Sequence, residues 1–160
     1  PSKGESTRQP MSAPSDIVFT FPGGTRVEGH VDQFTIETEQ PPDAAAPSPF
    51  TLFLLSIGAC ASYYVQSFCR QRGIAVNDIR VIQHNDTSVS GMVERIRLEV
   101  QLPNDFPTRY RDAVVRSAEQ CTVKRHLEHP PKITIEVASF ASSADHISNS
   151  VNTTQAIKQA

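Results

Sequence analysis

Hydrophobic and polar residues alternate along several segments of the chain. Between residues 92 and 102, Ile96, Leu98 and Val100 alternate with charged or polar side chains. A period of two is typical of a strand with one buried and one exposed face. Similar segments predict strands at residues 16–21, 25–31, 34–39 and 76–84, and at Ile133, Ile135 and Val137. The pattern therefore predicts six strands.

A long helix is predicted from Pro49 to about Arg72. Ser48 supplies a capping hydroxyl, and proline is favoured at the first helical position that follows. Gly73 is the expected stop residue. The helix divides the predicted strands into a group of three before it and the rest after it.

A second helix is predicted from Pro107 to Cys121, with a shorter helical piece continuing to Leu127. Steps of four, three and four residues place one stripe on a single helical face. The members of this stripe are Tyr110, Val114, Ser117 and Cys121. The order βββ-α-ββ-αα-β predicts an α+β domain with a six-stranded, mainly antiparallel sheet.

The long helix is apolar almost all round. One stripe consists of Phe53, Ile57, Ala61, Tyr64 and Phe68, and the other faces carry Leu52, Leu54, Leu55 and Val65. Such a helix is expected to be buried on nearly every side. We therefore expect a homodimer, although the second helix and the tails of one chain offer an alternative cover. The apolar run at 50–65 is shorter than the roughly 20 residues of a membrane helix, so no membrane partner is expected.

Composition limits the class of protein. A chain of 160 residues is the length of one domain, expected at residues 16–140 between tails at 1–15 and 141–160. With 38% hydrophobic and 20% charged residues, the chain resembles a globular protein and not a disordered one. A net charge of −2 argues against a nucleic-acid partner. Three cysteines, an odd number, argue against a secreted disulfide scaffold and predict a reducing, cytoplasmic location.

The cysteines are the candidate reactive groups. Cys60 lies in the long helix, Cys121 lies 61 residues later, and Cys69 points to a nearly opposite side of the helix from Cys60. Free cysteines often simply pack as small apolar side chains. Zinc held by Cys121, His126 and His129 would need a spacing that matches no standard pattern, so no metal is expected. A hydrolase pairing Cys60 with a histidine is a further alternative.

Two segments resemble the OsmC/Ohr family. Residues 48–60, SPFTLFLLSIGAC, are similar to the family helix that carries its first cysteine. Residues 119–127, EQCTVKRHL, are similar to the segment that carries the second, and the strand at 93–100 also fits. The resemblance extends over about residues 16–137. It is closest to the branch of the family without an assigned physiological substrate.

The resemblance implies a thiol-dependent peroxidase, an antioxidant enzyme of oxidative stress. Cys60 would be oxidised to a sulfenic acid and Cys121 would resolve it to a disulfide, with organic hydroperoxides preferred over hydrogen peroxide. An external dithiol, of the lipoyl type in the family, would reset the pair, and no cofactor is implied. The residues expected to contact the substrate are Phe50, Phe53, Ile57 and Tyr64.

Three positions depart from the family pattern. Phe50 stands where active members have a glutamate, and Thr122 replaces the proline that usually follows the second cysteine. Arg26 is the match for the arginine that activates the thiol, and a solvated hairpin charge is its alternative role. These departures leave a second hypothesis, a non-catalytic dimer of the same fold that binds a small apolar ligand at the subunit interface.

Overall fold

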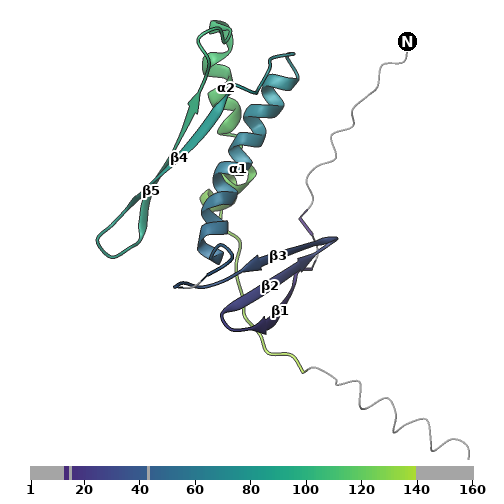
Figure 1. Cartoon of the computed structure of the whole chain (residues 1–160). Coiled ribbons are helices and arrows are strands. Elements are labelled where there is room, and N and C mark those ends of the chain that lie inside the picture. Colours follow the sequence, from purple (N-terminus) through teal and green to yellow (C-terminus); the bar gives the residue numbers. More distant parts are fainter. Residues whose placement is uncertain (1–12, 15, 43, 140–160) are drawn as a thin grey trace, which may run out of the picture. The chain divides into compact units, whose positions relative to one another are not determined.

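The computed structural model describes residues 13–14, 16–42 and 44–139 (Figure 1). The tails expected at 1–15 and 141–160 lie outside the described residues, apart from Ala13 and Pro14. The chain divides into two units after His129, and every helix and strand of the described residues belongs to the first unit. The domain expected at residues 16–140 stays a prediction.

Three strands precede the long helix and form an antiparallel sheet in the order β1-β2-β3. They are β1 (Val18–Gly23), β2 (Arg26–Val31) and β3 (Phe34–Thr38). Gly29 pairs with Phe19 on one side and with Ile36 on the other, so these residues share one face of the sheet. The Phe19 ring lies across Gly29, where a Cβ would stand 3.0 Å from it.

The long helix α1 (Pro49–Arg70) begins and ends close to its predicted bounds. The Ser48 hydroxyl accepts a hydrogen bond from the Thr51 N–H at 3.1 Å, which is the predicted cap. Gln71 is the C-cap residue of the helix, and Gly73 has a positive φ of 68°, which suits a residue without a Cβ. Its buried residues are Ile57, Ala61, Val65, Phe68 and Cys69.

A hairpin and the remaining helices follow α1. The hairpin consists of β4 (Arg80–Thr87) and β5 (Val93–Gln101), and β4 contacts α1. A short 3₁₀ turn, η1 (Thr108–Tyr110), leads into α2 (Arg111–Ala118), and α3 (Thr122–Glu128) completes the unit. The core lies where α2 packs against α1.

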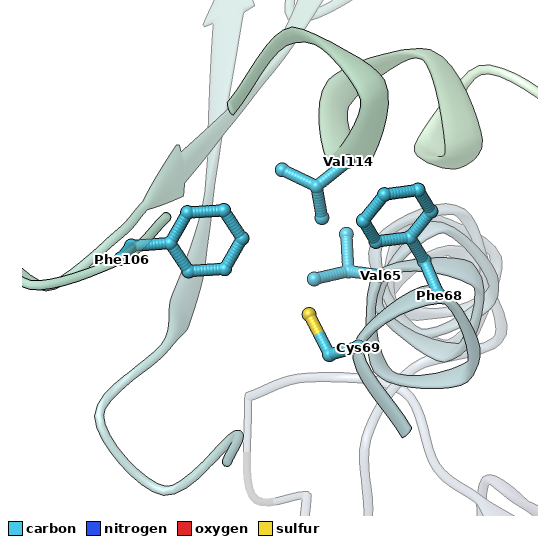
Figure 2. Packing of buried hydrophobic residues seen from close by; sticks show 5 residues of the cluster. All are labelled: Val65, Phe68, Cys69, Phe106 and Val114. Atoms are coloured by element: carbon cyan, nitrogen blue, oxygen red, sulfur yellow. The ribbon is translucent and has the colours of Figure 1, made fainter. Parts of the chain in front are cut away.

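Figure 2 shows this core. Val65, Phe68 and Cys69 of α1 meet Val114 of α2, and Phe106 closes the cluster from the segment after β5. The predicted stripe of the second helix faces inward, since Val114 is fully buried and the Tyr110 ring meets the Phe68 ring edge-on at 5.9 Å.

The mixed α+β class is confirmed, but the single six-stranded sheet is not. The described residues form five strands in two separate sheets. Ile133, Ile135 and Val137 alternate as a strand does, yet they form no strand and their exposed fractions are 82%, 96% and 102%. Alternation makes a strand only where the backbone also finds a partner at a sheet edge, and the structure pairs this segment with none of the described strands.

The two helix predictions fare differently. Within one chain α1 keeps one side exposed, because Phe50, Leu55 and Tyr63 are more than half exposed, and burial of that side by a second copy stays a prediction. The elements of one chain cover only the stripe that faces α2, α3 and β4. By length and composition alone α1 could also cross a membrane, a test that a core helix passes too. The second predicted helix ends at Ala118, and Cys121 is the N-cap residue of α3.

Substitution of Val114 tests the α1–α2 core. Val114→Ala removes two buried carbon groups and leaves a cavity, so we expect the free energy of unfolding to fall by about 2 kcal/mol. The neighbouring substitution Val115→Ala is the matched control, because it changes helix propensity equally at a side chain that is 46% exposed. Denaturant unfolding should show a change within about 0.5 kcal/mol for the control. Equal losses at both positions would contradict the described packing.

Candidate functional site

Cys60 and Cys121 meet between α1 and the start of α3. Cys60 is half-buried on α1, Cys121 is 1% exposed, and the Cys60 thiol lies close enough to Cys121 to raise the pKa of that thiol. The Cys121 Sγ also lies 3.9 Å from the carbonyl oxygen of Ile57, in the α1 turn before Cys60. The structure thus brings together the two cysteines that the resemblance singles out.

The helical stripe of α2 explains this meeting. Val114 and Ser117 face α1, and Cys121 continues their face beyond the end of α2. The Ser117 hydroxyl donates a hydrogen bond to the Val114 carbonyl at 2.6 Å and a longer one to the Tyr64 carbonyl at 3.4 Å. The packing that buries Val114 therefore directs Cys121 toward α1.

The surroundings of Cys121 favour the neutral thiol. Burial raises its pKa above the usual value, and the neighbouring Cys60 thiol raises it further. The backbone N–H groups of Lys124 and Val123 oppose this shift. Above the usual thiol pKa the unfolded chain loses this proton first, so the contribution of Cys121 to the free energy of unfolding falls as the pH rises.

Cys69 is separate from this pair. It is fully buried in the core beside Val65, and burial raises the pKa of its thiol while Arg72 opposes the shift. The Arg72 guanidinium itself lies over the Phe68 ring, 3.7 Å from its centroid. Cys69 acts as an apolar core side chain in this structure.

A cavity of about 530 Å³ lies beside Cys121. Its walls come from α1, β5, α2 and α3. The apolar lining residues are Ile57, Ile96, Leu98, Val100, Val115, Ala118, Cys121 and Leu127, and the charged ones are Arg95, Arg97, Glu119 and Lys124. The basic residues have acidic partners, since Arg97 contacts Glu99 at 3.2 Å and Lys124 contacts Glu128 at 3.4 Å. The cavity is thus mainly an apolar surface that reaches one thiol of the pair.

The four residues predicted to contact substrate do not lie in one place. Ile57 lines the cavity beside Cys121. Phe50 and Phe53 stack with ring centroids 5.7 Å apart and line a second cavity of about 400 Å³ against residues 92–96. Tyr64 lines neither cavity, and its hydroxyl instead contacts the Thr122 hydroxyl at 3.1 Å. The sequence did not predict the Tyr64–Thr122 contact. There, Thr122 was notable only because it replaces the proline that usually follows the second cysteine in the family.

Arg26 pairs with Glu37 across β2 and β3, with the charged atoms 4.0 Å apart. Both side chains are partly exposed, as expected of a hairpin charge. Among the described residues, no cationic side chain acts to lower the pKa of Cys121; only the backbone N–H groups of Lys124 and Val123 do so. An activating role for Arg26 remains a prediction.

Metal ligation finds little support in the geometry. In residues 13–14, 16–42 and 44–139, no three His, Cys, Asp or Glu side chains gather as a metal site requires. The His126 Nδ1 lies 2.8 Å from the Thr122 carbonyl oxygen, within its own helix.

Gln83 is a further neighbour of the site that the sequence pattern does not reveal. Its amide donates to the Leu54 carbonyl of α1 at 3.1 Å. A Cβ on Gly58 would lie 2.6 Å from the Gln83 Oε1, so the glycine lets β4 approach the α1 turn before Cys60.

Comparisons with known proteins agree with this fold. The family model described as OsmC-like protein matches residues 41–136. A putative osmotic stress induced and detoxification response protein from Psychrobacter arcticus is similar, with a TM-score of 0.58 and 17% identity over 73% of this chain and 88% of that one. An OsmC-like protein from Mycoplasma pneumoniae has a TM-score of 0.54 and 18% identity, over 72% and 87% of the two chains.

Identities of this size show a shared fold and nothing finer. No curated protein matches the sequence. The matched segment of the family model covers more than half of the chain and contains both Cys60 and Cys121. The chain therefore belongs to the OsmC-like protein family.

Proposed function

We propose that this chain is a thiol-dependent peroxidase that reduces organic hydroperoxides. The observation that carries the proposal is that Cys121 lies against the α1 turn before Cys60, close enough for the Cys60 thiol to raise its pKa. Cysteines that only fill a core have no need of a second thiol within reach. Family membership and the similarity to the putative detoxification response protein of Psychrobacter arcticus support the same function.

The proposed reaction begins at Cys60. Its thiolate attacks the O–O bond of the hydroperoxide, the bond breaks, and the alkoxide leaves as an alcohol after taking a proton. Cys60 is then a sulfenic acid. The Cys121 sulfur attacks the Cys60 sulfur, an S–S bond forms, and water leaves. An external dithiol, for which a lipoyl group is our candidate, reduces the disulfide by exchange.

The burial of the two thiols supports this order of events. Cys60 is partly exposed, so a substrate would reach it more readily than Cys121, which is almost fully buried. Burial and the neighbouring Cys60 thiol raise the pKa of Cys121, so the neutral form of Cys121 is favoured while Cys60 is reduced. A buried thiol beside a sulfenic acid suits the resolving role, because it is in place before the peroxide arrives.

The apolar cavity beside Cys121 supports an organic substrate. Burial of an alkyl chain on the apolar lining would stabilise the complex by about 25 cal/mol per Å². We assign Ile57 to this contact and Phe50 with Phe53 to a second apolar site for larger substrates. Hydrogen peroxide has no alkyl group to bury and should react less well.

Binding without turnover is the second candidate function. The feature that favours it is Phe50, since an apolar ring occupies the position of the family glutamate, and it stacks on Phe53 instead of holding a charged partner. A small apolar ligand would then occupy one of the two cavities, with the thiols inert.

We further propose that two copies of the chain form the functional unit in the cytoplasm. Phe19 and Ile36 lie on one face of the first sheet and are 60% and 45% exposed. The outer side of α1 adds Phe50, Leu55 and Tyr63, each more than half exposed. Exposed apolar surface of this extent marks an interface, and a second copy is the partner that the family implies. The segment at Ile133–Val137 is then proposed to become the sixth strand.

Substitution of single cysteines separates the two candidate functions. Cys60→Ser should abolish consumption of cumene hydroperoxide, and Cys121→Ser should leave a sulfenic acid that a dimedone probe captures. Cys69→Ser is the matched control and should keep full consumption. One equivalent of hydroperoxide should remove two titratable thiols from each parent chain. Survival of both thiols would overturn the peroxidase and leave the binding protein.

Alkylation rates test the assigned thiol environments. At pH 8, iodoacetamide should modify Cys121 and Cys69 at least about tenfold more slowly than Cys60, because both are buried with raised pKa values. The Cys121 rate should keep rising with pH beyond the range where free thiols have levelled off. Peptide mass spectrometry measures each rate, and denatured protein is the control in which the three rates converge. Equal rates for Cys60 and Cys121 in the folded chain would contradict the structure.

Sedimentation tests the proposed dimer. The parent protein should sediment as a dimer, and Leu55→Lys should weaken the association because it buries a charge on the outer side of α1. Val89→Lys is the control, since Val89 is fully exposed in the turn between β4 and β5. A monomeric parent at micromolar concentration would refute the dimer.

A further inference from the structure

A hydrogen bond ties together the two elements that carry the paired thiols. The Tyr64 and Thr122 hydroxyl oxygens are 3.1 Å apart. Tyr64 lies four residues after Cys60 on α1, which is one helical turn along the same face. Thr122 directly follows Cys121. The bond therefore lies beside the thiol pair and joins the same two parts of the chain.

Apolar packing alone gives the Cys121 segment few anchors. Cys121 lies in a short link between α2 and α3, with its N–H bonded to the Ala118 carbonyl at 3.1 Å. None of the seven residues of α3 is buried. Within the described residues, two side-chain hydrogen bonds connect α1 with α3 and its N-cap residue. One runs from the Cys121 thiol to the Ile57 carbonyl, and the other is the Tyr64–Thr122 bond.

We propose that the Tyr64–Thr122 hydrogen bond is a latch that holds the Cys121 thiol against Cys60. The pair are positioning residues, because neither hydroxyl is assigned a role in the reaction itself. The latch sets the effective concentration of one thiol at the other, and so sets the stability of the Cys60–Cys121 disulfide. The resolving step that it serves rests on the proposed peroxidase function, whereas the disulfide equilibrium does not.

The chemistry of position 122 makes the latch possible. Threonine offers a hydroxyl at the first position of α3, while the proline that is usual in the family has no polar side-chain atom. The position of the Tyr64 ring does not depend on the hydroxyl alone, because the ring packs edge-on against the Tyr63 ring with the centroids 5.8 Å apart. Tyr64→Phe therefore removes the bond and keeps the ring.

The test measures the reduction potential of the disulfide in thiol redox buffers, in a Cys69→Ser background that leaves one thiol pair. A hydrogen bond of ordinary strength predicts that Tyr64→Phe lowers the effective thiol concentration about fivefold. For this two-electron couple the potential becomes about 20 mV less negative. Thr122→Val should shift the potential by the same amount. The double variant Tyr64→Phe/Thr122→Val should shift it no more than either single variant. Thr122→Ser, which keeps a hydroxyl, should have the potential of the parent chain.

Ser117→Ala is the matched control. It removes a hydroxyl from the same interface, on α2, whose bond to α1 is the longer one at 3.4 Å. We expect an unchanged potential. Thermal unfolding of each reduced variant separates a shifted thiol pair from a loosened fold, because the potential is measured only on variants that remain folded at 25 °C.

Three results would overturn the latch. They are an unchanged potential in both single variants, a double variant whose shift is the sum of the two, and a parent chain that forms no Cys60–Cys121 disulfide in any buffer. No peroxide enters the measurement. If the variants shift the potential but the parent chain consumes no peroxide, the peroxidase is refuted and the latch stands. If the parent chain consumes peroxide but the variants leave the potential unchanged, only the latch is refuted.

Discussion

The packing of α1 against α2 governs where both reactive thiols lie. Val65 and Phe68 of α1 enclose Val114 of α2, and this contact sets the rotation of α2 about its own axis. Ser117 and Cys121 share the face of Val114, so they must also turn toward α1. The candidate site is thus a consequence of the core, because the packing of α1 against α2 is enough to bring Cys121 toward Cys60.

The same packing divides the two thiols by environment. Cys60 lies on the edge of the buried stripe of α1 and is partly exposed to solvent, while Cys121 is buried at the start of α3. Burial raises the pKa of the inner thiol, Cys121, and the neighbouring Cys60 thiol raises it again. A pair that shares one contact therefore has one accessible member and one protected member, as our proposed order of oxidation and resolution requires.

The features that could be predicted from the sequence are those that depend on neighbours along the chain. The cap at Ser48, the stop at Gly73 and the α2 stripe each follow from residues within a few turns, and the structure confirms them. The order of five strands and three helices was also accessible from the alternation patterns. The resemblance of the segments around Cys60 and Cys121 to the OsmC/Ohr family is confirmed by the family match.

The rest depends on contacts between distant residues. The Tyr64–Thr122 bond joins two residues that are 58 positions apart in the chain, and the approach of Gln83 to Gly58 joins two that are 25 positions apart. No local sequence pattern indicates either contact. One chain forms no strand at Ile133–Val137, because alternation indicates that one face is to be buried but does not say by which surface.

The unmatched predictions share a physical cause. The sheet β1-β2-β3 joins Thr20, His30 and Thr35 by hydrogen bonds on one face and exposes Phe19 and Ile36 on the other. The outer side of α1 and the segment after α3 likewise carry apolar residues that one chain leaves in solvent. A sequence pattern reflects the surfaces buried in the functional assembly, and a single chain displays only part of that burial. The positions where the pattern and the single chain disagree are therefore the positions at which our proposed second copy would bind.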